Sequence, residues 1–350
     1  MRRWTTILSC LLLATLISVV TGWQQVRPMA VAQVPRNNKS QNGTISDKGA
    51  TSPVADADSV EDYPEFLVDE IIVRLTTATM DLIEQKKSRT TKELRPELDR
   101  THIPLNLPAP ATTPLSTVEL YRRATQSVFL VAGITRPTEE ETSWQTSFST
   151  AFAVHPDGIL ATSAHVFDHE DPDDAVVVMD IHGTIYPVLE LLAADRDTDT
   201  CIFRIEKKNL TPLPLKSKTP PGSAIRVIGH PGDSFFYFSA GYIANYERDE
   251  NEILWMNVTA DFGQGSSGGP VMDEAGNVVG QVSRTFTLYA GGDTSTRGIR
   301  RAHPSRQKTE TETAPGDADT PDHQEQPDRA DPQMVFKACT PAASIRSLTK

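Results

Sequence analysis

The chain has 350 residues, a formal net charge of −12 and a hydrophobic content of 38%. An acidic chain without a basic stripe of interleaved aromatic residues is not expected to bind nucleic acid. The length permits one or two domains, and Pro outnumbers Gly by 25 to 20. We therefore expect part of the chain to lie outside a packed core.

Residues 1–32 are typical of a signal peptide or a membrane anchor. Two arginines precede an apolar run from Ile7 to Val20, which is short for a membrane span and suits the hydrophobic region of a signal peptide. Small residues at 30–32 offer a cleavage site, and cleavage nearer Gly22 is the alternative. The segment predicts export to the periplasm or secretion, with a membrane tether if it is retained.

A polar segment and a helical extension come next. Residues 33–62 are rich in polar and small residues and are predicted to form a disordered linker. Within residues 63–114, apolar side chains recur at helical spacing from Phe66 to about Lys87 and predict one amphipathic helix. This helix would pack on the main domain or on another subunit, and residues 101–114 would form a Pro-rich extended connector.

Residues 115–350 are predicted to form an all-β domain, because short β-rich runs alternate with turn signals such as Pro156–Gly158. Short helices are expected at 118–125 and at 342–348, and a disordered polar insert at about 290–333. The expected strands cover residues 127–133, 148–154, 159–163, 175–179, 185–192, 200–205, 224–228, 241–244, 253–258, 270–272 and 278–283.

Ser267 is the candidate nucleophile. A serine hydroxyl needs a base to take its proton and hydrogen-bond donors to hold the oxyanion that forms. The glycines at 265 and 268 let the backbone turn tightly around Ser267, so that the amides of Gly265 and Ser267 can point at one spot. The alternative is an ordinary loop rich in Gly and Ser.

His165 is the candidate general base, because it follows an apolar run at a strand end and an imidazole titrates near neutral pH. Three acids precede the predicted strand at residue 200, and the nearest to it, Asp199, is the candidate carboxylate that orients the histidine. Asp195 and Asp197 are interpreted as solvated turn residues.

These segments, in the order His, Asp, Ser, resemble the trypsin/chymotrypsin-type serine proteases, and most closely their HtrA/Deg-like bacterial branch. His165 and Asp199 are 34 residues apart, and Asp199 and Ser267 are 68 apart, as in compact bacterial members of the family. The resemblance covers residues 115–348. It includes the run before His165, the segment Val227–Gly232, the Gly-Ser-Ser-Gly-Gly-Pro motif and the closing Ala-Cys-Thr-Pro.

The resemblance implies two six-stranded antiparallel β-barrels with a helical N-terminal extension and a C-terminal helix. It also implies hydrolysis of peptide bonds in protein or peptide substrates through an acyl-enzyme. It further implies substrate-binding roles for Ser283 and for Asp261, which stands where trypsin-like enzymes set the floor of the specificity pocket. Arg284 could instead neutralise Asp261, and a solvated or internally paired Asp261 is the favoured interpretation.

The chain departs from the family pattern in three places, one of which is the polar insert at about 290–333, where the family has a short loop flanking the substrate cleft. Ser149-Thr150-Ala151-Phe152 replaces the usual Gly-Ser-Gly-Phe, and peptide capture by a PDZ domain is not expected because the chain ends just after the final helix. No cofactor or metal site is expected. Cys201 and Cys339 remain after signal removal and are close enough to pair only if the fold brings them together. An inactive binding module of the cell envelope is the alternative function, and an oligomer is possible.

Overall fold

The computed structural model describes residues 65–137, 144–169, 173–289 and 332–350, which fall in one compact unit of the chain, residues 59–350. The predicted signal segment, the linker and nearly all of the insert lie outside the described residues. Among the described helices, none has the length and apolar character needed to cross a membrane.

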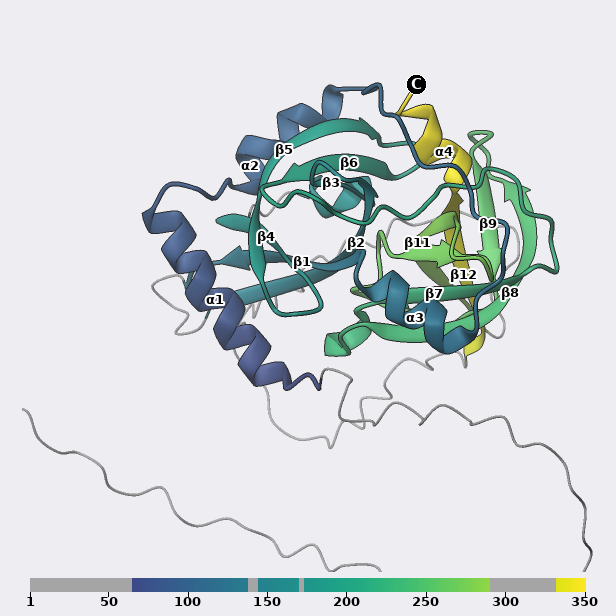
Figure 1. Cartoon of the computed structure of the whole chain (residues 1–350), viewed down its shortest axis with the longest axis horizontal. Coiled ribbons are helices and arrows are strands. Elements are labelled where there is room, and N and C mark those ends of the chain that lie inside the picture. The colour runs from purple at the N-terminus through teal and green to yellow at the C-terminus, as the bar shows by residue number, and fades with distance from the viewer. Residues whose placement is uncertain (1–64, 138–143, 170–172, 290–331) are drawn as a thin grey trace, which may run out of the picture. The chain divides into compact units, whose positions relative to one another are not determined.

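Six antiparallel strands close a first barrel in the order β1-β2-β3-β6-β5-β4 (Figure 1). β-Branched residues dominate β4, and all five of its residues are buried. Gly158 has a φ of 77° in the β2–β3 turn, where an added Cβ would lie 2.1 Å from the carbonyl oxygen of Lys207. The strands are β1 (Val128–Thr135), β2 (Gln145–His155), β3 (Ile159–Thr162), β4 (Ala175–Met179), β5 (Ile185–Asp195) and β6 (Thr200–Ile205).

Six further antiparallel strands close a second barrel in the order β10-β11-β12-β9-β8-β7, so the two six-stranded barrels are confirmed. Several boundaries were wrong: β8 and β11 are longer than predicted, and β12 begins at Pro332, inside the predicted insert. The strands are β7 (Ala224–Gly229), β8 (Tyr237–Arg248), β9 (Leu254–Val258), β10 (Pro270–Met272), β11 (Val278–Tyr289) and β12 (Pro332–Pro341).

The three predicted helices are present as α1 (Val68–Glu84), α3 (Thr117–Thr125) and α4 (Ala342–Ser347). α1 lies against β1 and β4 on the outside of the first barrel (Figure 1). The helix α2 (Thr91–Leu94) and the 3₁₀ helix η2 (Arg95–Asp99) were not predicted from the sequence. Their signal was a capping box, in which the Thr90 hydroxyl accepts from the amide of Glu93 and the Glu93 carboxylate accepts from the amide of Thr90.

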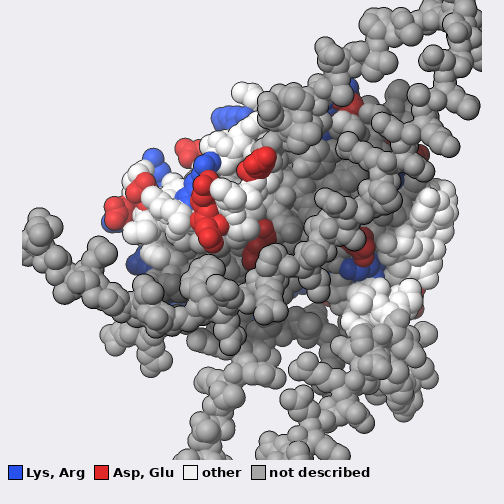
Figure 2. All heavy atoms as spheres, turned by 90° about the horizontal axis from the view of Figure 1, so that it is seen from below, with Lys and Arg blue, Asp and Glu red and all other residues white. Residues whose placement is uncertain are grey.

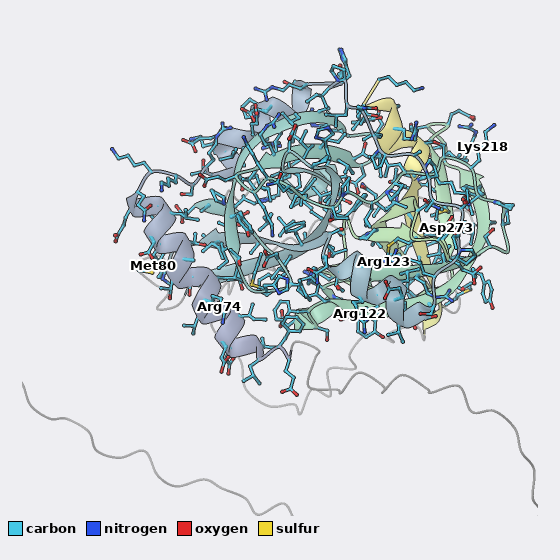
Figure 3. The ribbon with its side chains drawn as sticks, viewed as in Figure 1. Arg74, Met80, Arg122, Arg123, Lys218 and Asp273 are labelled. Atoms are coloured by element: carbon cyan, nitrogen blue, oxygen red, sulfur yellow. The ribbon has the colours of Figure 1, made fainter. Side chains whose placement is uncertain are left out.

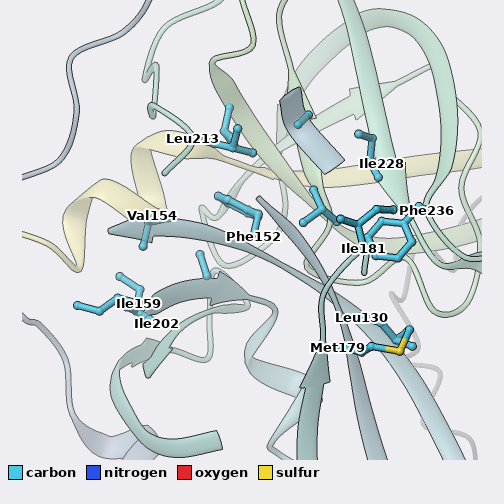
Figure 4. Packing of buried hydrophobic residues seen from close by; sticks show 14 of the residues in the cluster. Leu130, Phe152, Val154, Ile159, Met179, Ile181, Ile202, Leu213, Ile228 and Phe236 are labelled. Atoms are coloured by element: carbon cyan, nitrogen blue, oxygen red, sulfur yellow. The ribbon is translucent and has the colours of Figure 1, made fainter. Parts of the chain in front are cut away.

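The apolar core of the first barrel continues into the second. Phe152 is fully buried in β2, and the same cluster includes Ile228 of β7 and Phe236 of the loop after it (Figure 4). Each buried side chain of this size stabilises the fold by about 1.5–3 kcal/mol. Packing therefore fixes the loop after β7 against the first barrel.

The connector ties the N-terminal extension to the C-terminus. Residues 101–112 contain neither helix nor strand. The amide of Ile103 donates to the carbonyl of Leu348 at 2.7 Å, and the amide of Ala111 donates to the side-chain oxygen of Asn277 at 2.7 Å. The connector is thus held to the C-terminal segment and to the turn between β10 and β11.

Charged side chains of both signs are mixed on the described surface. Figure 2 shows acidic and basic residues next to one another on the face it draws. Arg122 and Arg123 project from α3 (Figure 3), and both pair with Glu119 one turn earlier. Exposed pairs of this kind contribute little stability, and no basic stripe emerges in the described part of the chain.

Candidate active site

His165 and Asp199 are directly hydrogen-bonded, because the end of β3 lies beside the start of β6, where Thr162 pairs with Cys201. His165 lies in a 3₁₀ turn, η3 (Ala164–Val166), just after β3. Its Nδ1 is 2.9 Å from Oδ2 and 3.0 Å from Oδ1 of Asp199, and its backbone amide donates to Oδ1 at 3.0 Å. The His165 side chain is 49% exposed and that of Asp199 only 15%, so an exposed imidazole is held by a largely buried carboxylate.

Asp199 is the one of the three neighbouring acids that bonds to His165. It occupies the turn between β5 and β6 with a φ of 54°, in the left-handed region that Asp tolerates better than most residues. Asp195 instead accepts hydrogen bonds from the amides of Asp197 and Thr198, at 3.0 and 3.3 Å, and closes the turn. The turn aims Asp199 at the end of β3.

Each of the two groups stabilises the charged form of the other. Burial alone would raise the pKa of Asp199, but attraction to His165 and hydrogen bonds from His165 and Ser283 outweigh it and lower the pKa. Burial alone would lower the pKa of His165, but its attraction and hydrogen bond to Asp199 raise it above 6.5. The carboxylate therefore stabilises an imidazolium at this position.

Ser267 comes from the turn before β10, in the second barrel. Its carbonyl accepts from the amide of Thr150 in β2 at 2.9 Å, and the amide of Gly268 donates to Val282 at 2.8 Å. Gly268 has a φ of 82°, and an added Cβ would lie 2.2 Å from the Thr162 hydroxyl oxygen and 2.8 Å from the amide nitrogen of Ser163. The Ser267 turn is thus packed on the segment that leads into His165.

The hydroxyl of Ser267 donates to the carbonyl of Ser283 at 3.4 Å. The hydroxyl of Ser283 in turn donates to Oδ2 of Asp199 at 2.6 Å. The structure therefore joins His165, Asp199 and Ser283 directly, and joins Ser267 to them through Ser283. Transfer of the Ser267 proton to His165 requires the Ser267 hydroxyl to turn from Ser283 to the imidazole.

The peptide groups that precede Gly265 and Ser267 each accept a hydrogen bond at their carbonyl oxygen. The carbonyl of Gln264 accepts from the amide of Gly232 at 3.0 Å, and that of Ser266 accepts from the amide of Gly269 at 2.9 Å. In a trans peptide the N–H points opposite to the carbonyl. The amides of Gly265 and Ser267, the expected oxyanion donors, are therefore turned away from these two contacts and left for another acceptor.

Asp261 and Ser283 occupy different environments. Asp261 is on the surface with 84% of its side chain exposed, and Oδ1 lies 3.9 Å from Nζ of Lys337. Ser283 is buried, with its hydroxyl committed to Asp199. Arg284 stacks on the Trp255 ring at 3.7 Å, and its Nη2 lies 3.9 Å from Oδ2 of Asp249. Asp261 thus fits the solvated interpretation better than the floor of a pocket.

Gln281 is a site residue that the sequence analysis missed. Its side-chain amide donates to the carbonyls of Thr162 and Asp199, at 3.2 and 2.9 Å. Gln281, which belongs to the second barrel, therefore hydrogen-bonds both segments of the first barrel that carry His165 and Asp199. A lone Gln in an apolar strand carries no sequence signal for this role, because the contact exists only once the barrels pack.

The two cysteines in the described part of the chain are free and buried, in separate apolar clusters around Cys201 and Cys339. Burial raises the pKa of both thiols, so neither is a reactive thiolate at neutral pH. Over the described residues, no three His, Cys, Asp or Glu side chains gather in a way that would hold a metal ion.

The raised pKa of His165 predicts the pH dependence of any reaction that uses it as a base. Protonated His165 cannot accept a proton, so activity is absent at low pH and rises as His165 loses its proton. We expect kcat/KM, which reports the free protein, to reach half its maximum above pH 6.5. A midpoint at or below 6.5 in a pH profile would contradict the described His165–Asp199 pairing.

Residues 149–280 match the family model described as trypsin-like peptidase domain. Curated relatives include the probable periplasmic serine endoprotease DegP-like of Marinomonas sp. (26% identical; 42% of this chain and 32% of the relative) and that of Hahella chejuensis (27%; 41% and 31%). The chain thus spans about a third of the length of these relatives.

Solved structures that match the chain include a serine endoprotease from Yersinia pestis, which is 22% identical with a TM-score of 0.40. The match covers 50% of this chain and 60% of that one. An HtrA-type protease with decapeptide is 21% identical with a TM-score of 0.42, covering 51% and 61%.

Proposed function

We propose that this chain is a serine endopeptidase acting on protein or peptide substrates, which is supported by the match of residues 149–280 to the trypsin-like peptidase domain and by the similarity to DegP-like endoproteases. Ser267 is the nucleophile, His165 the general base and Asp199 the carboxylate that orients it. The observation that carries the proposal is the hydrogen bond of 2.9 Å between His165 and Asp199, beside a Gly-flanked serine turn.

In the proposed reaction, His165 takes the Ser267 proton as the hydroxyl oxygen attacks the substrate carbonyl. Asp199 accepts from Nδ1 of His165, which leaves Nε2 as the acceptor for that proton. The amides of Gly265 and Ser267 bind the oxyanion. The proton then passes from His165 to the leaving amine, and water releases the acyl group from Ser267.

The protein is proposed to work outside the cytoplasm. The curated relatives are named periplasmic endoproteases, and the N-terminal segment has the pattern of an export signal. Cell fractionation tests this, and also separates a free protein from one tethered by residues 1–32. The alternative function is an inactive protease-fold binding module.

A fluorophosphonate probe tests the proposed function, because it labels only an activated serine. We expect labelling of the purified chain at Ser267, located by peptide mass mapping, and cleavage of an unfolded protein such as casein. A chain that folds but neither labels nor cleaves would support the binding module instead.

The exposure of Asp261 predicts no preference for a basic residue before the scissile bond. Matched peptides with Val, Ala or Arg at that position should show no faster cleavage after Arg than after Val or Ala, and Asp261→Ala should leave the relative rates unchanged, because a solvated carboxylate gives little selectivity. A strong Arg preference that Asp261→Ala removes would restore Asp261 as a specificity residue.

A further inference from the structure

His230 is buried beside the proposed oxyanion turn, yet it has no part in the proposed reaction. It follows β7 and is fully inaccessible to solvent. Its Nδ1 is 2.9 Å from the hydroxyl oxygen of Thr150, and that hydroxyl is 2.8 Å from the carbonyl oxygen of Gly265. A continuous hydrogen-bonded path therefore leads from His230 through Thr150 to Gly265.

Because the Thr150 hydroxyl has a single proton, the donor and the acceptor in each hydrogen bond of this path can be assigned. The carbonyl of Gly265 can only accept, so the single hydroxyl proton of Thr150 goes to it. The oxygen of Thr150 must then accept from His230, which places a proton on Nδ1. Nε2 of His230 is left as a buried lone pair, in keeping with its lack of a hydrogen-bond partner among the described residues.

Aromatic rings pack around this histidine, and its burial keeps the imidazole neutral. The ring of Phe236 lies 4.7 Å from that of His230, edge to face, and Phe235 lies 6.2 Å away. Phe66, just before α1, stacks on Phe236 at 5.2 Å. Burial lowers the pKa of His230 to about 3, so its single proton stays in place across the pH range in which His165 titrates.

The path ends on the residue whose conformation sets one proposed oxyanion donor. Gly265 has a φ of 95°, and an added Cβ would lie 2.2 Å from the carbonyl oxygen of His230. The peptide before Gly265 is held by the amide of Gly232, two residues after His230, and the peptide after it by Thr150. Both peptide planes that flank Gly265 are thus anchored by the pair and its loop.

We propose that Thr150 and His230 are positioning residues that hold the oxyanion turn through the Gly265 carbonyl. The proposal rests on the proposed serine endopeptidase function, since an oxyanion site matters only if an oxyanion forms. Without the Thr150 hydroxyl, the Gly265–Ser266 peptide keeps only the hydrogen bond from the Ser266 amide to the carbonyl of Gly263, at 3.0 Å. The backbone at Gly265 is then less firmly held, and the Gly265 amide can shift from the position in which it meets the developing charge.

Thr150→Val tests the proposal, because valine matches threonine in shape and lacks the hydroxyl. We expect kcat on a peptide substrate to fall roughly ten- to hundredfold, the size of effect that a misplacement near 1 Å produces, with KM nearly unchanged. Thr150→Ser keeps the hydroxyl and should restore most of kcat. A merely structural role would lower the amount of folded protein without this split between kcat and KM.

Ser127→Ala is the matched control. Ser127 is a buried residue at the start of the same barrel, and its hydroxyl donates to the carbonyl of Thr211 at 2.6 Å, away from the turn. We expect its kcat to match the unmodified chain. An active chain in which Thr150→Val and Ser127→Ala have equal kcat would overturn the positioning role alone, whereas an unmodified chain that neither labels nor cleaves would overturn the proposed function and the role with it.

Nitrogen-15 NMR of the unmodified chain with labelled histidine measures which ring nitrogen of His230 carries the proton, and so tests the direction of the path without any variant. We expect His230 to be neutral, with the proton on Nδ1 and none on Nε2, from pH 5 to pH 8. A proton on Nε2 would reverse the path and overturn the proposal, even if Thr150→Val does not fold.

Discussion

Ser267→Ala is expected to lower turnover by about 10⁶-fold, the size of loss when a serine protease triad loses its nucleophile. The change should leave the fold intact, because the side chain makes one long hydrogen bond, of 3.4 Å, to Ser283. Initial rates on a peptide substrate, with circular dichroism and thermal unfolding as checks on the fold, measure it.

His165→Ala should cause a similar loss, and the double variant should be little worse than either single one, because nucleophile and base act as one unit. His155→Ala is the matched control, since His155 sits at the β2–β3 turn and accepts from the amide of Asp157 at 3.3 Å. Turnover near that of the unmodified chain in Ser267→Ala or His165→Ala would rule out the assignment.

Many strands were predicted because alternation and turn residues are local signals, whereas the two barrels were implied by the resemblance. Ala175–Met179 and Thr200–Ile205 were predicted to the residue. β8 was predicted four residues long and has twelve, because exposed polar residues such as Glu247 extend it beyond the apolar run. Its far end forms through pairing with β9, where Glu247 lies opposite Trp255.

The residues proposed for catalysis were found from the sequence because each sits beside a strand end or in a Gly-rich turn. The residues that support them were not found from the sequence. Ser283 was assigned to substrate binding, and its hydroxyl bond to Asp199 depends on β11 of one barrel meeting a turn of the other. Thr150 and His230 are likewise 80 residues apart, and no periodicity connects them before the barrels pack.

Asp199→Asn is expected to lower kcat by about 10⁴-fold near neutral pH, as in trypsin-like triads that lose this carboxylate. Asp199 accepts from Nδ1 and the backbone amide of His165 and from the hydroxyl of Ser283. An amide has one oxygen to accept with, and its NH₂ group favours the imidazole with the proton on Nε2. That tautomer cannot take the Ser267 proton.

The loss should shrink at high pH, where hydroxide can take the Ser267 proton in place of His165, so the full pH profile is the measurement. Asp195→Asn and Asp197→Asn are the matched controls in the same turn. Asn at 195 can still accept from the amides of Asp197 and Thr198 through its remaining oxygen, and the Asp197 side chain is exposed, so both variants should keep most of their activity. If Asp197→Asn were the severe variant, the turn would present a different acid to His165 than the structure does, and the carboxylate assignment would move by two residues.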